Sequence, residues 1–209
     1  MDISNIRKDY SSGTLDDDNS SKKPYSLFEK WFNIAVSKVI VEPTAMILST
    51  VNPDGMPRSR VVLLKYHLEN EFFFFSNYNS SKAKELLFSN KASVLFFWPQ
   101  LEQQIRIEGV VEKCSDECSD NYFNERPILS RISACISPQS SVIPSRKWLD
   151  DEHSKFCKSN QNPQRPNFWG GYKLVADFYE FWQGRENRLH DRLQYKLISN
   201  TWSCERLAP

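Results

Sequence analysis

Residues 44–66 read TAMILSTVNPDGMPRSRVVLLKY, and they carry the clearest strand and turn signals in the chain. Residues 44–51 are rich in strand-forming residues, and Asn52-Pro53-Asp54-Gly55 is a strong turn signal. Residues 58–66 then resume an extended, mostly apolar pattern. Two such runs on either side of a turn predict an antiparallel β-hairpin.

Further strands and helices are expected along the rest of the chain. The strands are expected at residues 71–76, 92–98, 103–113, 173–183, 191–199 and 202–207. The helices are expected at residues 26–38, 80–89, 115–137 with a break at Arg126-Pro127, and 144–158. Strands and helices do not alternate regularly, which argues against a doubly wound parallel sheet. The sequence therefore predicts an α+β fold built on a mainly antiparallel β-barrel.

The first 23 residues differ from the rest in composition. Residues 1–23 are polar and carry Asp16-Asp17-Asp18, so we expect a flexible arm and not a secretory signal. Residues 24–209 are expected to form a single domain. Ser26 and Glu29 have the spacing of a capping box, which predicts that the first helix begins at Ser26.

Composition argues against some classes of protein. The chain has 209 residues, of which 40% are hydrophobic, and a formal net charge of +1. A charge so close to zero gives no reason to expect binding to nucleic acid or to a membrane surface. Five cysteines are an odd number, which fits free thiols in a reducing, cytoplasmic setting.

The common signatures of metal and nucleophilic catalysis are missing from the sequence. His67, His153 and His190 have no second ligand-type residue at metal-binding spacing. Cys114 and Cys118 lack a partner pair for a zinc site. The sequence also lacks a nucleophile elbow and a glycine-rich phosphate loop. We therefore expect no metal.

Cations bracket the strand expected at residues 58–66. Arg58 and Arg60 lie near one end and Lys65 near the other. A strand with solvated ends explains this pattern, but Arg and Lys at strand ends can also hold phosphate oxygens. In a regular strand Arg60 and Lys65 point to opposite faces, so they would serve different anions unless a bulge realigns them.

Two other segments could contribute to an anion site. Residues 76–82 lead from a strand into a helix, whose N-terminus with Lys82 could bind an anion, although capping by Ser80 accounts for the pattern more simply. Tyr122, Arg126 and Ser130 are spaced by four and would share one helical face, but the proline after Arg126 bends or ends that helix.

The densest cationic cluster is residues 180–192, EFWQGRENRLHDR. Four cationic or potentially cationic residues, His190 among them, fall within eight residues beside Trp182. A solvated hairpin turn with a core tryptophan explains this cluster. So basic a turn beside aromatic residues also fits a site for an aromatic, anionic ligand.

Together these stretches resemble the pyridoxamine 5'-phosphate oxidase family, whose flavin-dependent members make pyridoxal 5'-phosphate. The resemblance runs from about residue 7 to residue 209, with its motifs in the right order. They are residues 60–65, Gln139-Ser140-Ser141, Phe168-Trp169-Gly170-Gly171, residues 180–184 with 188–192, and Arg206-Leu207-Ala208-Pro209. The resemblance implies an FMN-binding split β-barrel with peripheral helices, and a homodimer with FMN at the subunit interface.

The resemblance also implies a cofactor site. Arg60 and Lys82 should contact the FMN phosphate, while Gln139, Ser140 and other residues should close the site from the second subunit. The residues expected to bind FMN are Arg60, Val61, Val62, Leu63, Leu64, Lys65, Phe75, Ser76, Ser81, Lys82, Gln104, Gln139, Ser140, Trp182 and Arg192. At Ser81 the family usually has Arg, so the phosphate clamp of this chain is one cation short.

The implied substrates are pyridoxamine 5'-phosphate and pyridoxine 5'-phosphate, with dioxygen as acceptor and hydrogen peroxide as a product. Arg188 and His190 are expected to be catalytic and to face the substrate ring. The residues expected to bind substrate are Arg7, Tyr10, Lys65, Tyr122, Arg126, Ser130, Arg188 and His190. Two phosphorylated aromatic ligands need two cationic clamps, which agrees with the opposed Arg60 and Lys65.

Two alternatives stay open at this point. A split-barrel flavin-binding protein could lack oxidase activity, and a pyridoxal-phosphate carrier could only store and deliver the product. Retention of the expected substrate residues weighs against both. The sequence does not decide which substrate is preferred, or whether pyridoxal 5'-phosphate has a second site.

Overall fold

The computed structural model describes residues 1–5, 9–16, 23–38, 41–159 and 162–209. The strands in these residues are β1 (Ala45–Val51), β2 (Pro57–Leu63), β3 (Tyr66–Leu68), β4 (Glu71–Asn77), β5 (Lys91–Trp98), β6 (Gln103–Lys113), β7 (Trp169–Gln183), β8 (Asp191–Ile198) and β9 (Thr201–Leu207). The helices are α1 (Pro24–Ser37), α2 (Ser81–Phe88), α3 (Asp116–Glu125), α4 (Ile128–Ile136) and α5 (Arg146–Lys158), with a 3-10 turn η2 (Glu186–Arg188). Within the described ranges no helix is long and apolar enough to span a membrane.

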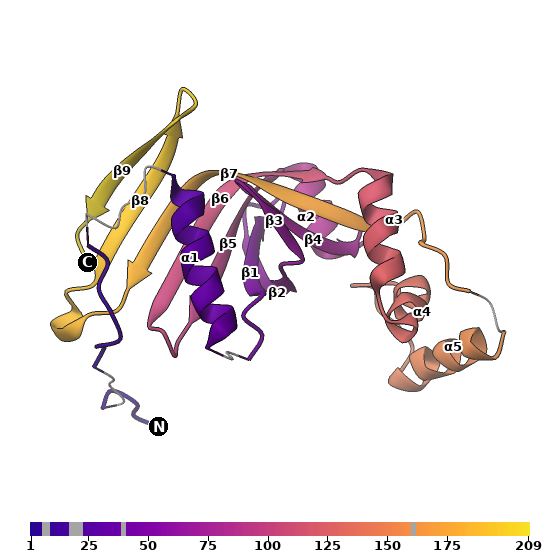
Figure 1. Ribbon diagram of the computed structural model, residues 1–209. Helices are drawn as coiled ribbons and strands as arrows, with labels where there is room; N and C mark the ends of the chain where they lie inside the picture. Colours follow the sequence, from indigo (N-terminus) through magenta and orange to yellow (C-terminus); the bar gives the residue numbers. More distant parts are fainter. Residues whose placement is uncertain (6–8, 17–22, 39–40, 160–161) are drawn as a thin grey trace.

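All the described strands join one curled sheet (Figure 1). Its order is β2-β1-β5-β6-β7-β4-β3, while β8 pairs with β7 and β9 pairs with β8. Every pairing is antiparallel. This confirms the prediction of a mainly antiparallel α+β fold.

Strand β7 is the spine of the sheet and joins two regions that matter for function. One edge of β7 pairs with β6, while the other pairs first with β4 and then with β8. Strand β7 contains a β-bulge at Asp177, which has no paired residue on β6, because Glu108 pairs with Phe178 and Gly109 with Ala176. A Cβ atom on Gly109 would lie 1.9 Å from the carbonyl oxygen of Val175, so the close approach of β6 to β7 at this point requires glycine. In Figure 1, β7 runs from the α3–α4 region to the β8–β9 hairpin.

Helix α1 packs across the sheet and supplies much of the core. The ring of Phe28 meets that of Phe72 at 4.8 Å, and Trp31 meets Phe181 at 5.4 Å. The predicted capping box is wrong, because α1 begins at Pro24 and its N-cap is Lys23. Proline suits the first helical position, since its fixed φ is already helical and its missing N–H would have no partner there.

The predicted hairpin of residues 44–66 is confirmed, but its second strand is interrupted. Ser49 pairs with Ser59 in the β1–β2 ladder, and β2 ends at Leu63. The N–H of Leu64 still donates to Thr44, whereas the N–H of Lys65 donates to Phe73 of β4. The chain therefore crosses from one strand partner to another, and β3 starts anew after the crossing.

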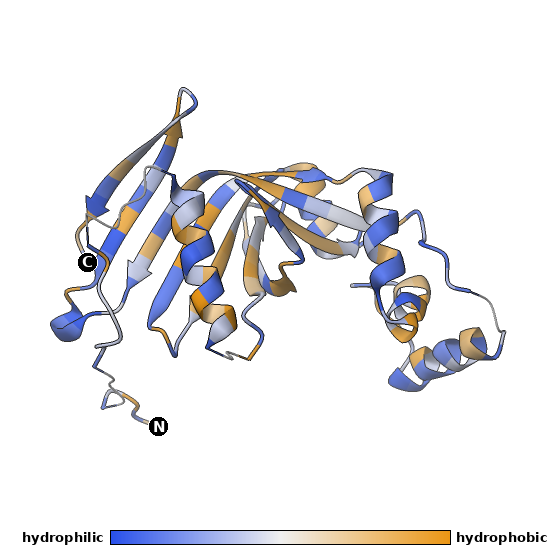
Figure 2. Ribbon diagram, viewed as in Figure 1, coloured by the Kyte–Doolittle hydropathy of each residue, from blue (hydrophilic) through white to orange (hydrophobic). Residues whose placement is uncertain are grey.

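The peripheral segments differ in how firmly they pack. The predicted break at Arg126-Pro127 is confirmed, since it separates α3 from α4. Part of the expected N-terminal arm contacts the body, because Leu15 is buried and the N–H groups of Ser11 and Ser12 donate to the Glu102 carboxylate. Helix α5 is mostly hydrophilic (Figure 2), and none of its residues is buried.

Candidate functional site

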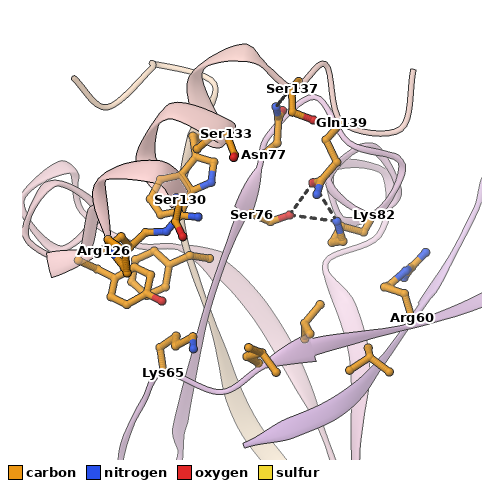
Figure 3. A pocket seen from close by; sticks show the side chains of 18 residues that line it. Arg60, Lys65, Ser76, Asn77, Lys82, Arg126, Ser130, Ser133, Ser137 and Gln139 are labelled. Atoms are coloured by element: carbon orange, nitrogen blue, oxygen red, sulfur yellow. Dashed lines mark hydrogen bonds between the residues drawn. The ribbon is translucent and has the colours of Figure 1, made fainter. Parts of the chain in front are cut away.

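A cavity of about 640 Å³ lies between β2, the end of β4 and helices α2, α3 and α4 (Figure 3). Its lining residues are Arg60, Val61, Val62, Leu63, Lys65, Phe75, Ser76, Asn77, Lys82, Tyr122, Arg126, Pro127, Ser130, Ser133, Ala134, Ser137, Gln139 and Trp169. Within the described chain, this lining includes four cations and no carboxylate. Such a cavity favours an anionic ligand.

Lys82 points into one side of the cavity from the first turn of α2. Its ammonium donates to Ser76 Oγ at 3.0 Å and to Gln139 Oε1 at 3.2 Å. Burial, and then the nearby charge of Arg60, lower the pKa of Lys82 from its ordinary value. Ser80 is the N-cap residue of α2, but its hydroxyl donates to the Asn77 carbonyl and does not cap the helix. Of the described residues at the start of α2, Lys82 is the one that lines the cavity.

Arg60 enters the same side of the cavity from β2 and is held by a buried carboxylate. Its Nη2 donates to Oε2 of Glu85 at 2.8 Å, and its Nη1 donates to the Thr50 hydroxyl. Arg58 donates to the other oxygen of Glu85 at 3.1 Å. Burial alone would raise the pKa of Glu85, but these hydrogen bonds and the arginine charges lower it, so the carboxylate is ionised at neutral pH.

An aromatic wall with one guanidinium forms the opposite side. Tyr122 stacks on Phe75 at 4.0 Å between ring centroids, and Trp169 stacks on Phe75 at 5.7 Å. The guanidinium of Arg126 lies 4.6 Å from the centre of the Trp169 ring. Burial lowers the pKa of Arg126, and its Nη1 has no hydrogen-bond partner among the described residues. A buried N–H group without a partner is costly, so this side is suited to a ligand oxyanion.

Lys65 lies on the Arg126 side and Arg60 on the Lys82 side (Figure 3). A continuous strand would have pointed Lys65 and Arg60 to opposite faces, but the chain crosses from β1 to β4 at residues 64–65. The interruption has the realigning effect of a bulge and brings both cations to one cavity. The two groups of cations therefore occupy separate sides of a single cavity.

Not every expected cofactor residue lies in this cavity. Leu64 was expected to lie along FMN, but its side chain is only 3% exposed and packs in the core. Ser81 starts α2 and Ser140 follows Gln139, yet neither is among the described lining residues. Gln139 was expected from a partner subunit, but here it contacts Ser76 and Lys82 of its own chain.

A second cluster of expected site residues lies at the other end of β7. Trp182 and His190 are 4.7 Å apart between ring centroids, and Tyr10 packs edge-on against both. Along the strand Trp182 is 13 residues from Trp169, or roughly 40 Å at about 3.3 Å per residue. Arg7 lies outside the described residues. One chain therefore does not bring this cluster to its own cavity.

Three more expected residues belong to this far cluster. Gln104 pairs with Trp182 across β6 and β7. Arg192 donates to the buried carboxylate of Glu180 at 2.9 Å. Arg188 is exposed and has φ 61°, in the left-handed region that non-glycine residues rarely occupy. Such backbone strain is found most often at functional sites.

The N–H of Arg185 donates to Nδ1 of His190 at 3.1 Å. In the neutral ring this contact leaves the proton on Nε2.

Sequence reasoning missed Glu85, which contacts Arg60, Arg58 and Thr50 at once. A signal existed, because Glu85 falls on the same helical face as the buried Lys82 and Leu86. A carboxylate on a buried face needs a cationic partner. Trp169 also lines the cavity, although the resemblance placed it only within a family motif and implied no role for it in the site.

Comparisons with known proteins agree on one family. Residues 32–156 match the family described as pyridoxamine 5'-phosphate oxidase, and residues 169–209 match the C-terminal dimerisation region of pyridoxine 5'-phosphate oxidase. A curated pyridoxine/pyridoxamine 5'-phosphate oxidase of Polynucleobacter asymbioticus is 45% identical over 208 residues, covering 99% of both chains. One of Burkholderia lata is 46% identical over 211 residues, again covering 99% of both.

Solved structures share the fold. PhzG from Burkholderia lata, in complex with tetrahydrophenazine-1-carboxylic acid, is similar with a TM-score of 0.89 and 28% identity, covering 94% of this chain and 98% of that one. A pyridoxamine 5'-phosphate oxidase-related, FMN-binding protein from Nostoc punctiforme has a TM-score of 0.72 and 17% identity, covering 91% and 100%. The curled antiparallel sheet is thus the split barrel of these proteins.

Proposed function

The chain belongs to the pyridoxamine 5'-phosphate oxidase family, and from that premise we propose that it is an FMN-dependent oxidase that makes pyridoxal 5'-phosphate. Pyridoxine 5'-phosphate and dioxygen would give pyridoxal 5'-phosphate and hydrogen peroxide. Pyridoxamine 5'-phosphate would in addition take up one water molecule and release ammonia.

One observation carries the proposal: the cavity has two separate cationic sides. Arg60 and Lys82 form one, while Lys65 and Arg126 form the other. Two phosphorylated aromatic molecules that react with each other need two phosphate clamps and a space for stacked rings between them. The cavity volume of about 640 Å³ lies in the usual range for small-molecule sites.

The residues present fit FMN on the Arg60 side. Arg60 and Lys82 would hold the phosphate, and Val61, Val62 and Leu63 offer backbone and apolar surface beside it. When bound, FMN would supply the two-electron acceptor for the substrate carbon and pass the electrons to dioxygen. The unpartnered Nη1 of Arg126 is the matching feature on the substrate side.

The chain's own residues would bind and orient the substrate. Lys65, Arg126 and Ser130 would hold its phosphate, and Tyr122 would line the same pocket. Arg188 and His190 would contact the substrate ring from the far cluster. His190 would present its Nε2–H as a hydrogen-bond donor, because its Nδ1 accepts from the backbone.

A second copy of the chain is needed to complete this site. The far cluster lies roughly 40 Å along β7 from the cavity wall, as given by strand rise. The match of residues 169–209 to a dimerisation region supports a two-fold dimer in which β7 and β8 of one chain close the cavity of the other.

Five free cysteines also support a reducing, cytoplasmic location.

A second candidate function comes from PhzG, whose structure contains a tricyclic carboxylic acid. The Burkholderia lata proteins allow a direct comparison. This chain is 46% identical to the curated phosphate oxidase of that species and 28% identical to its PhzG. The clamp of Lys65, Arg126 and Ser130 also suits a substrate phosphate. Pyridoxine or pyridoxamine 5'-phosphate is therefore favoured over the tricyclic acid as substrate.

An aerobic assay of purified protein tests the proposal. Protein loaded with FMN would be given pyridoxine 5'-phosphate, pyridoxamine 5'-phosphate or tetrahydrophenazine-1-carboxylic acid. We expect aldehyde and peroxide in equal amounts from the phosphorylated substrates. Turnover of the tricyclic acid alone would favour the second candidate, and flavin binding without any turnover would favour a non-oxidase binding protein.

A further inference from the structure

We propose that Glu85 is a positioning residue for the cofactor phosphate, and that Arg58 assists it without reaching the cavity. This inference rests on the proposed function, because it concerns how Arg60 is held ready for the FMN phosphate. Glu85 and Arg58 are not among the described cavity-lining residues, whereas Arg60 is. Any effect they have on the ligand must therefore pass through Arg60 or through their charge.

Glu85, Thr50 and Arg60 form a closed ring of hydrogen bonds. The Thr50 hydroxyl donates to Oε2 of Glu85 and accepts from Nη1 of Arg60, while Nη2 of Arg60 donates to the same carboxylate oxygen. The Glu85 side chain is 3% exposed and that of Arg60 is 21% exposed. A ring of this kind fixes the plane of the guanidinium. Since a guanidinium has five N–H donors, some remain for an oxyanion.

Arg58 compensates the charge that Glu85 brings to the site. A lone carboxylate beside Arg60 would repel a phosphate and weaken its binding. Nη1 of Arg58 lies 3.1 Å from Oε1 of Glu85, so the phosphate meets a nearly neutral Glu85–Arg58 pair and the full charge of Arg60. Arg58 is half exposed and is not among the cavity-lining residues, which leaves charge balance as its main contribution.

Glu85 also supports the second cation of the clamp. Burial and the charge of Arg60 lower the pKa of Lys82, and the carboxylate of Glu85 acts against both by raising it. One buried carboxylate on α2 thus orients Arg60 and favours the charged form of Lys82. This chain has Ser81 in place of a third cation, so its phosphate clamp depends on these two.

Flavin titrations of full-length protein freed of bound flavin test the proposal. FMN and riboflavin would be titrated into wild type, Glu85→Ala, Glu85→Gln, Arg60→Ala and the Glu85→Ala/Arg60→Ala double variant. Riboflavin has the same ring system but lacks the phosphate. Glu112→Ala serves as the control, because it removes an equal charge that pairs with Lys173 outside the cavity lining.

We expect Glu85→Ala to raise the Kd for FMN about tenfold, and to leave the Kd for riboflavin and the control variant unchanged. In the Arg60→Ala background, the same substitution should change the Kd for FMN far less than in wild type, because only its influence on the charge of Lys82 remains. Glu85→Gln should fall between wild type and Glu85→Ala, and it keeps the result readable if the alanine variant folds poorly.

Three results would overturn the inference. Equal weakening of FMN and riboflavin would show a general structural role for Glu85. Tighter FMN binding by Glu85→Ala would show that its charge opposes the ligand. Additive effects in the double variant would show that it does not act through Arg60. If wild-type protein binds neither flavin, the proposed function fails first and the inference falls with it, so the two failures are distinguishable.

Discussion

Replacing Arg126 with methionine should damage substrate binding without damaging the fold. Arg126 lies 4.6 Å from the Trp169 ring, and its buried Nη1 has no partner among the described residues. Losing the cation–π contact costs about 0.5–2 kcal/mol. Removing a buried, unpaired N–H group stabilises the fold by about 1–3 kcal/mol, and the thioether of methionine keeps a favourable contact with the indole.

The balance of these contributions changes the free energy of unfolding by about −1 to +2.5 kcal/mol in Arg126→Met, so the variant should stay folded. Binding of pyridoxal 5'-phosphate, by contrast, should lose a charge-assisted contact of about 1.5–3 kcal/mol, or roughly 10- to 150-fold in Kd. Urea denaturation at fixed protein and FMN concentrations would measure stability, and a spectroscopic titration would measure product affinity.

Arg131→Met is the matched control, because Nε of Arg131 is also buried without a partner in the described structure but lies outside the cavity lining. We expect it to be at least as stable as Arg126→Met, because it loses no cation–π contact among the described residues, while keeping normal product affinity. A loss of stability above about 2 kcal/mol in Arg126→Met would refute the reasoning about the unpaired group. An unchanged product affinity would remove Arg126 from the phosphate clamp.

Three further predictions concern the reaction and the flavin phosphate. Arg188→Ala and His190→Ala should each lower kcat by an amount equivalent to about 2–4 kcal/mol while FMN stays bound, and an unchanged kcat in both would exclude them from the mechanism. Ser81→Arg should lower the Kd for FMN about tenfold by adding a charge-assisted contact at the start of α2, and an unchanged Kd would mean that Arg60 and Lys82 already complete the clamp. FMN affinity should fall as the pH rises through the pKa of Lys82, because only the protonated ammonium binds the phosphate. Since that pKa is lowered, the fall should occur below the ordinary value of 10.5. A Lys82→Met variant that shows the same fall would contradict this assignment.

Local sequence signals predicted most of the elements because turn and helix signals act over a few residues. The turn at Asn52-Pro53-Asp54-Gly55 and the break at Arg126-Pro127 were both predicted, since glycine and proline restrict or free the backbone directly. The capping box at Ser26 failed, because Pro24 offered an earlier start for the helix.

Long-range pairing explains what the sequence did not predict. The strand expected at residues 58–66 is interrupted at Leu64. There the backbone stops pairing with β1 and begins to pair with β4, and no local sequence signal predicts that change of partner strand. Strand parity therefore predicted that Arg60 and Lys65 face opposite sides, while the structure places them in one cavity. The contacts of Glu85 were missed for the same reason, since its partners Arg58, Arg60 and Thr50 lie on two strands far from α2 in sequence.

On the proposal made above, the far cluster of a second chain completes the cavity of the first. Mixing Arg60→Ala chains with Arg192→Ala chains, each inactive alone, tests it most directly. If the two residues serve one site from different chains, random pairing restores about one quarter of the wild-type sites, and oxidase activity should rise accordingly. If both residues serve a site within one chain, no mixture contains an intact site, and an activity that stays at the level of the single variants would rule out a site shared between two chains.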